Sequence, residues 1–202
     1  MYRYLLPLLL GILLSGCASK PLYPPAPARA EGASDWTYLL GPGDSVNVFV
    51  WGNPEVSGSF AIRPDGKMTM SLVEDLPATG KTPTQLAREI EKILGKYIQD
   101  PIVTVTVAGG VGPYSQQIRV LGQATKPQTL SYREHMSLLD LLIAVGGITD
   151  FAAGNHASIL RVADGKPQQF GVRLDDLIRD GDVSANVELR PGDVLIIPER
   201  WF

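Results

Sequence analysis

Valine alternates with other residues in two stretches of the chain, and this period of two predicts strands with one buried face. The stretches are 45–50 and 102–107. The faces predicted to be buried carry Val46, Val48 and Val50 in the first strand and Val103, Val105 and Val107 in the second. Further strands are expected at 118–121, around Leu130, at 158–162, at 169–172 and at 194–197. The chain should therefore be rich in short strands.

Clusters of glycine, proline and aspartate predict the turns between these strands. Proline presets one backbone angle, glycine supplies a positive one and aspartate can bond its own backbone. Gly41-Pro42-Gly43-Asp44 precedes the first valine strand, and Pro191-Gly192-Asp193 repeats the pattern near the end of the chain. Asp65-Gly66 follows a strand through Phe60 and Ile62 and predicts a hairpin with a two-residue type I′ loop. Met68 and Met70 should share one face of the returning strand, and Asp164-Gly165 should join two later strands.

Two segments have the period of a helix. Thr82-Pro83-Thr84-Gln85 has the form of a capping box and predicts an amphipathic helix of about fifteen residues whose apolar stripe covers the sheet. The stripe consists of Leu86, Ile90, Ile93, Leu94 and Tyr97. Ser137 should begin a second helix that is apolar almost all round, hence buried, and that ends at Gly146-Gly147. One more helical turn is expected at 174–178.

The N-terminus has the pattern of a secretory signal. Arg3 supplies the positive end, and the apolar run at 5–14 is interrupted by proline and is shorter than the roughly 20 residues that a membrane span needs. Residues 1–16 are therefore predicted to be a signal peptide. Leu14-Ser15-Gly16-Cys17 matches the lipobox of bacterial lipoproteins, so Cys17, the only cysteine, is predicted to carry the lipid. A buried or chance cysteine is the alternative.

Residues 17–34 are rich in proline among alanine, glycine and serine, which cannot form a core. We interpret them as the lipidated tether, with a ligand for a proline-recognition module as the alternative. Over the whole sequence, 45% of the residues are hydrophobic and 19% are charged, a composition that is typical of a globular protein. The formal net charge of −3, without a Lys/Arg cluster, argues against nucleic-acid binding.

Few residues suggest chemistry. The two histidines, His135 and His156, have no metal-ligand spacing and are expected at the surface. Asp44 and Asp193 would be candidates for paired catalytic carboxylates, but a turn explains each of them. No catalytic residue, metal site or cofactor is predicted, and the chain is not expected to be an enzyme.

The turn, the valine strand, Trp51-Gly52-Asn53-Pro54 and Arg63-Pro64-Asp65-Gly66 together resemble the polysaccharide export domain of Wza-type outer-membrane export lipoproteins. Val120-Leu121-Gly122-Gln123, the end of the second helix and the second Pro-Gly-Asp turn resemble the soluble-ligand-binding β-grasp (SLBB) domain that follows it. Gln128 replaces a glycine that many relatives carry. The resemblance implies an α+β fold of two domains. A small β-rich export domain, which contains one amphipathic helix, would span 35–108. A linker would follow at 109–116 and a β-grasp domain at 117–202.

The resemblance also implies a function. The chain would be a lipid-anchored protein at the periplasmic face of the outer membrane, because alanine rather than aspartate follows Cys17. Identical subunits would form a homo-oligomeric ring that guides a polysaccharide chain in transit, with an inner-membrane polysaccharide copolymerase as partner. Because the sequence stops at Phe202 without the family's pore helix, a separate outer-membrane β-barrel is a further expected partner.

The last five residues, Pro198-Glu199-Arg200-Trp201-Phe202, resemble the end of the short export protein of exosortase-associated exopolysaccharide systems. Trp201 and Phe202 either cap the core or contact a partner, depending on their exposure. Two other functions stay open. One is a periplasmic small-ligand (sugar) binding lipoprotein, and the other is a structural envelope anchor without a transport role.

Overall fold

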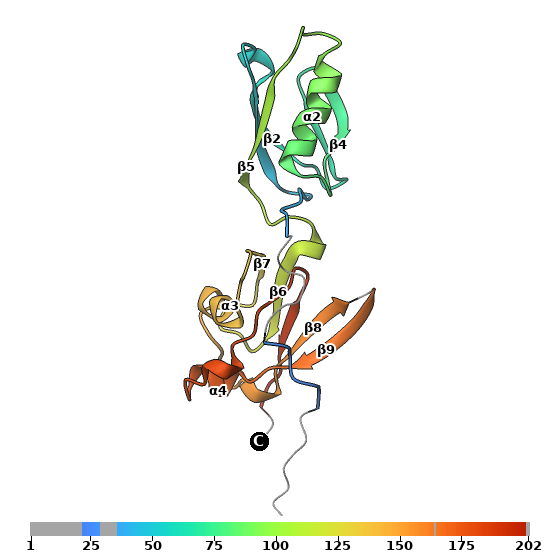
Figure 1. The fold of residues 1–202 in the computed structure, drawn as a ribbon. Helices are drawn as coiled ribbons and strands as arrows, with labels where there is room; N and C mark the ends of the chain where they lie inside the picture. Colours follow the sequence, from blue (N-terminus) through green and yellow to red (C-terminus); the bar gives the residue numbers. More distant parts are fainter. Residues whose placement is uncertain (1–21, 29–35, 164, 201–202) are drawn as a thin grey trace, which may run out of the picture.

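The computed structural model describes residues 22–28, 36–163 and 165–200. The fold is α+β, with two groups of elements stacked end to end (Figure 1). Each group has its own hydrophobic cluster, and we call them the N-terminal lobe (38–109) and the C-terminal lobe (116–200). The predicted signal peptide, Cys17, Asp164, Trp201 and Phe202 lie outside the described residues.

The N-terminal lobe is built on a three-stranded antiparallel sheet of order β2-β1-β5. Its strands are β2 (Gly58–Ala61), β1 (Ser45–Val50) and β5 (Val103–Gly109). The predicted valine faces are buried except at Val107, which is 40% exposed because it lies beyond the cover of the helix. Helix α2 (Pro83–Leu94) and the hairpin of β3 (Lys67–Met70) and β4 (Val73–Pro77) pack on the inner face of the sheet (Figure 1). A 3-10 turn, η3 (Pro54–Val56), follows β1.

The loop at Asp65-Gly66 differs from the predicted type I′ hairpin. Gly66 has a positive φ of 80°, but Asp65 does not, and the Gly66 N–H donates to the Arg63 carbonyl at 2.8 Å. Pro64 fixes the second position of this turn at a negative φ, which displaces the loop by one residue. The returning strand β3 then pairs with β4, which was not predicted, rather than with β2. Met68 and Met70 are both buried, as predicted.

Helix α2 begins as predicted and ends earlier. The Gln85 N–H donates to Thr82 Oγ1 at 3.1 Å, and the Thr82 N–H donates to Gln85 Oε1 at 2.9 Å, which completes the capping box. The helix has twelve residues and stops at Gly95, so Tyr97 lies outside it and is 63% exposed. The prediction that Tyr97 belongs to the buried stripe was therefore wrong.

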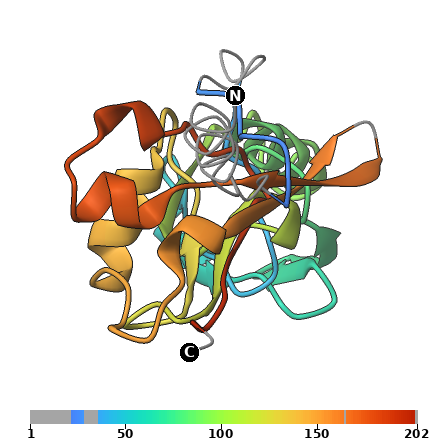
Figure 2. The same cartoon turned by 90° about the horizontal axis from the view of Figure 1, so that it is seen from below.

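The C-terminal lobe contains a five-stranded sheet of order β7-β6-β10-β8-β9. Its central strands β6 (Gln117–Gly122) and β10 (Val194–Ile197) are parallel, and its other pairs are antiparallel. The remaining strands are β7 (Thr129–Ser131), β8 (Ser158–Ala163) and β9 (Lys166–Gly171). Figure 2 shows α3 (Leu138–Val145) and α4 (Leu174–Ile178) on one side of the lobe and the β8-β9 hairpin projecting on the other. A parallel central pair with a helix packed on the mixed sheet is the β-grasp arrangement expected from the sequence.

Helix α3 is capped as predicted but is not buried all round. Ser137 and Asp140 form a capping box, and Gly146 ends the helix with a φ of 76°. Leu138, Leu141, Leu142 and Val145 are buried, whereas Ile143 is 72% exposed. One face of the helix is not covered by the sheet, so the all-apolar sequence leaves an exposed hydrophobic side chain there. Short 3-10 turns complete the lobe: η4 (Tyr114–Gln116), η5 (Gly154–His156) and η6 (Val183–Ala185).

Part of the predicted tether is attached to the C-terminal lobe. The Gly171 N–H donates to the Pro24 carbonyl at 2.8 Å, and the Ala26 N–H donates to the Gly171 carbonyl at 3.1 Å. The Glu188 N–H donates to the Ala28 carbonyl at 3.1 Å. Residues 22–28 thus bond backbone groups of Gly171, at the end of β9, and of Glu188, and are not a free spacer, because an extended chain can use unpaired groups at a sheet edge. Among the described residues, no helix has both the length and the apolar character needed to cross a membrane.

Candidate functional site

The two Pro-Gly-Asp turns have the same local geometry. Gly43 and Gly192 have φ values of 88° and 86°, which fits the third position of a type II turn. In the first turn, the carboxylate of Asp44 accepts the Gly41 N–H at 2.8 Å. In the second, the carboxylate of Asp193 accepts the Arg190 N–H at 2.8 Å. The repeated sequence therefore encodes one local structure twice.

Asp44 also joins segments that are distant in the sequence. Its carboxylate is fully buried, and Oδ1 accepts the N–H groups of Val111 and Gly112, each at 3.0 Å. Oδ2 accepts the Tyr38 hydroxyl at 2.7 Å in addition to the Gly41 N–H. Burial, followed by the hydrogen bond to Asp44 and its negative charge, raises the pKa of Tyr38 above its ordinary value. The turn accounts for only one of the four bonds that this carboxylate receives.

The glycine-rich linker between the lobes is fixed by these contacts. A Cβ atom at Gly110, where φ is 144°, would lie 2.0 Å from Asp44 Oδ1. A Cβ atom at Gly41 would lie 2.3 Å from the carbonyl carbon of Gly112. Glycine is needed at both positions so that the linker backbone can approach the Asp44 turn. The linker was predicted at 109–116, and the structure shows that Asp44 holds part of its backbone.

Gln116 holds the same junction from the side of the C-terminal lobe. Its Oε1 accepts the Leu39 N–H at 3.0 Å, and its Nε2 donates to the Thr37 carbonyl at 3.0 Å. The Trp36 ring makes edge contacts with Tyr132 and Tyr38, at centroid distances of 5.2 and 6.4 Å. We call the segments 36–44 and 110–117 together the interlobe joint. Sequence reasoning missed Gln116 because nothing in its local pattern indicates a partner.

Asp193 has a different second role. Its two carboxylate oxygens accept Nε and Nη2 of Arg161 at 2.9 and 2.7 Å, and both side chains are almost fully buried. Arg161 Nη2 also lies 3.3 Å from the Glu188 carbonyl, and the guanidinium carbon lies 5.7 Å from the centre of the Phe170 ring. The signal for this pair was a single charged residue within an apolar strand, which needs a partner when buried. Asp44 and Asp193 lie in different lobes and do not form a carboxylate pair.

Asp65 forms an exposed ion-pair cluster. Arg63 Nη2 lies 2.5 Å from Asp65 Oδ2 and 2.7 Å from Asp75 Oδ1. The hydrogen bond from Arg63 lowers the pKa of Asp65 to about 2, and the bonds to the two aspartates raise the pKa of Arg63. These exposed groups stabilise a surface loop and are a useful comparison for the buried carboxylates.

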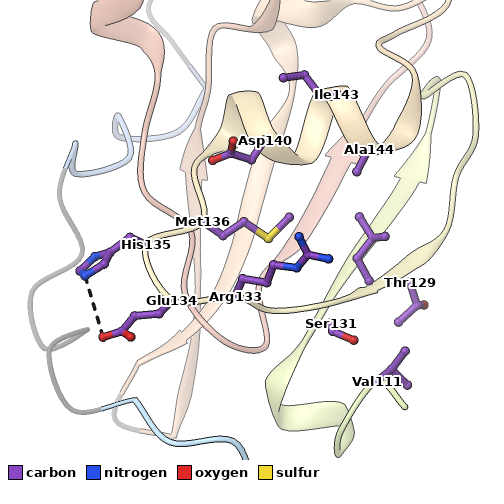
Figure 3. Close-up of a pocket in the computed structure, with 11 residues that line it drawn as sticks. Val111, Thr129, Ser131, Arg133, Glu134, His135, Met136, Asp140, Ile143 and Ala144 are labelled. Carbon is purple, nitrogen blue, oxygen red and sulfur yellow. Dashed lines mark ion pairs between the residues drawn. The ribbon is translucent and has the colours of Figure 1, made fainter. Parts of the chain in front are cut away.

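A cavity of about 640 Å³ opens on the C-terminal lobe between α3 and β7 (Figure 3). The loop 133–136 and Val111 of the interlobe joint complete its lining. The side chains of Arg133 and Met136 lie between α3 and β7 in Figure 3. Asp140 accepts the Ser137 N–H and hydroxyl, which lowers the pKa of Asp140. This cavity was not predicted, because the sequence does not show how β7, the loop 133–136 and α3 pack against one another and against Val111.

The predicted surface histidines are confirmed. His156 is exposed, and His135 is exposed with its Nδ1 3.0 Å from Glu188 Oε1. In the described part of the chain, no three His, Cys, Asp or Glu side chains are placed to hold a metal ion.

Two adjacent stretches of the chain match known families. Residues 32–108 match the family described as polysaccharide biosynthesis/export protein, and residues 116–197 match the SLBB domain. The chain is 26% identical over 188 residues to the EPS I polysaccharide export outer membrane protein EpsA of Ralstonia nicotianae. It is 25% identical over 163 residues to the polysialic acid transport protein KpsD of Escherichia coli, and 29% identical over 180 residues to the exopolysaccharide production protein ExoF of Rhizobium meliloti. Each alignment covers 81% of this chain but only 48%, 28% and 41% of the respective relative, so the chain spans about half or less of their length.

Proposed function

Because the chain belongs to the Wza-type family of polysaccharide export proteins, we propose that it takes part in exporting an exopolysaccharide across the bacterial envelope. The observation that carries this proposal is the succession of an export region and an SLBB region within one chain. The names of EpsA and KpsD, an export and a transport protein, agree with it. In this role the chain guides the polymer, and synthesis or an inner-membrane copolymerase supplies the drive.

The proposed complex is a ring of identical subunits, anchored at the periplasmic face of the outer membrane by lipid on Cys17. A ring closes only if each subunit presents its two contact surfaces at a fixed rotation. The two hydrogen bonds that Asp44 accepts from Val111 and Gly112, and the two that Gln116 makes with Leu39 and Thr37, support this arrangement, since they restrain the lobes relative to each other. Several buried acyl chains, at about 0.8 kcal/mol for each methylene group, would make the anchor effectively irreversible.

Deletion of the gene in a polysaccharide-producing host is expected to retain the polymer in the periplasm. The physical reason is that, in the proposed complex, this ring is the component that guides the polymer from the inner to the outer membrane. Polymer is measured in the medium and in periplasmic extracts, with the wild-type gene returned on a plasmid as control. Secretion that continues unchanged would contradict the export role.

Ring formation is tested by the mass of the Cys17→Ser protein in the presence of the inner-membrane copolymerase. The chain has a mass of 21.8 kDa before processing, and we expect one species that contains several copies. Native mass spectrometry gives the copy number, and the protein without the copolymerase is the comparison. A monomer in both samples would contradict the ring.

A second candidate function is the binding of a small sugar, and the cavity between α3 and β7 favours it. Its volume of about 640 Å³ lies within the range of small-molecule sites. Saturable binding by a monomer, together with normal polymer export in the deletion strain, would support this function instead.

A further inference from the structure

The outer face of the β2-β1-β5 sheet has an unusual composition. None of the three strands contains Asp, Glu, Lys, Arg or His, in a chain of which 19% is charged. The inner face is packed against α2 and β3-β4, whereas no described element covers the outer face (Figure 1). An uncharged sheet surface is prone to association unless something else occupies it. Packing within the described residues therefore does not explain why the outer face of this sheet lacks charged side chains.

Two aromatic rings lie on this face. Phe49 is 53% exposed and Trp51 is 69% exposed, and their rings are in edge contact with a centroid distance of 6.3 Å. They are separated by one residue, so they lie on the same side of the sheet. The backbone of Trp51 continues the pairing of β1 with the chain before β5, because the Trp51 backbone N–H donates to the Ile102 carbonyl at 3.0 Å.

Small neutral polar groups surround the rings. Thr104 is directly opposite Phe49 in the register of β1 and β5. Asn47 lies between Ser59 and Thr106 on the two neighbouring strands, and the Ser59 hydroxyl donates to Asn47 Oδ1 at 2.5 Å. All four polar residues are exposed. We call Asn47, Phe49, Trp51, Ser59, Thr104 and Thr106 the aromatic platform.

We propose that the aromatic platform binds uncharged sugar rings of a polysaccharide. A pyranose ring has an apolar C–H face, which suits a Phe or Trp ring, and hydroxyl groups at its rim, which suit serine, threonine and asparagine side chains. The proposal rests on the export function and adds to it the location of a glycan contact and the chemical class of sugar. The platform lies within the region that matches the export family.

The same observations argue against two other occupants. A dry contact with a second copy of the chain would remove water from four polar side chains, each at a cost unless it finds a new partner. An acidic polymer would require a cation, and Arg is the usual partner of sugar carboxylates and phosphates. The strands of the platform supply none. A neutral ligand with hydroxyl groups needs no cation, and its hydroxyl groups can form hydrogen bonds with the four polar side chains.

The test is a titration of the detergent-solubilised full-length protein with cellohexaose, a neutral oligosaccharide whose rings expose flat C–H faces. Isothermal calorimetry measures the affinity, and the part of the fluorescence change that is lost in Trp51→Ala reports on Trp51, because the chain has three tryptophans. Trp51→Ala and Phe49→Ala are each expected to weaken binding about tenfold, as loss of one aromatic contact predicts. Trp51→Tyr should retain most of the affinity. Tyr114→Ala, which removes an aromatic side chain that is 76% exposed at the interlobe joint, is the matched control and should bind like the wild type.

The outcomes separate the platform from the export function. Failure of the wild type to bind cellohexaose, equal binding by Trp51→Ala, or equal binding of hexagalacturonate, which carries a carboxylate on each ring, would each overturn the proposal. A fall in oligomer mass in Trp51→Ala without a change in sugar affinity would identify the face as a contact between copies and would also overturn it. The deletion experiment measures polymer export without reference to the platform. A negative result for the platform would therefore leave the proposed export function untouched.

Discussion

Replacing Asp44 with alanine is expected to lower the free energy of unfolding by about 4 kcal/mol. The substitution removes the acceptor of four hydrogen bonds and leaves the N–H groups of Gly41, Val111 and Gly112 without their partner. A buried donor without a partner costs about 1–3 kcal/mol. Since small proteins are stable by only about 5–15 kcal/mol, this loss is a large part of the total. Urea unfolding, followed by circular dichroism, measures it.

Asp44→Asn should lose part of this stability. In either orientation of the amide, its NH₂ group faces at least one N–H donor, from the linker or from Gly41. Asp65→Ala is the control, because Asp65 is also a turn aspartate next to glycine but its carboxylate is exposed. We expect that control to unfold close to the wild-type midpoint. An Asp44→Ala protein as stable as the Asp65 control would show that the joint does not depend on the carboxylate.

Replacing Arg161 with alanine is expected to destabilise the protein by about 3–5 kcal/mol. Arg161 forms two hydrogen bonds to Asp193, which is only 1% exposed. Removal of Arg161 therefore leaves a buried carboxylate without its cation. Breaking one side of a buried ion pair is costly because the remaining charge is neither solvated nor paired. The same urea titration measures the change in unfolding free energy.

The double variant Arg161→Met, Asp193→Asn is the informative comparison. It removes both charges and keeps an acceptor for the Arg190 N–H, so it should be more stable than Arg161→Ala. Arg63→Ala is the matched control, since Arg63 is also paired with carboxylates, those of Asp65 and Asp75, but at the surface. If Arg161→Ala and Arg63→Ala lowered the free energy of unfolding by the same small amount, the buried pair would stabilise the protein no more than the exposed pair does.

The two substitutions should also differ in how they affect the lobes. Arg161 lies in β8 and Asp193 directly precedes β10, so the loss of their ion pair should weaken the C-terminal lobe. Asp44 bonds residues 111 and 112 of the linker, so its loss should also release the joint. In the proposed ring, the second change is expected to matter more, because a different angle between the lobes would change the rotation from one subunit to the next.

Patterns that depend on neighbouring residues were predicted well. The structure contains, where the sequence placed them, the valine strand at 45–50, the capping box of α2, the start of α3 after Ser137, the helical turn at 174–178 and the two Pro-Gly-Asp turns. The loop at Asp65-Gly66 was predicted wrongly because the adjacent Pro64 displaces it, and other predictions failed where a distant segment decided the result. Ile143 is exposed because the sheet covers only part of α3, and β3 pairs with β4 rather than β2.

The sequence by itself determined the α+β class, the two Pro-Gly-Asp turns, the helix starts at Thr82 and Ser137 and the resemblance to export proteins, because these depend on residue types within a few positions of each other. Only the tertiary structure decided what the turn carboxylates bind. Asp44 meets Val111 across 67 residues, Gln116 meets Thr37 across 79, and Asp193 meets Arg161 across 32. It also decided that Phe49 and Trp51 share an exposed, uncharged sheet face, since which face is covered depends on where α2 and the β3-β4 hairpin pack. Local rules set the backbone conformation, whereas packing between distant segments sets the partners of each side chain.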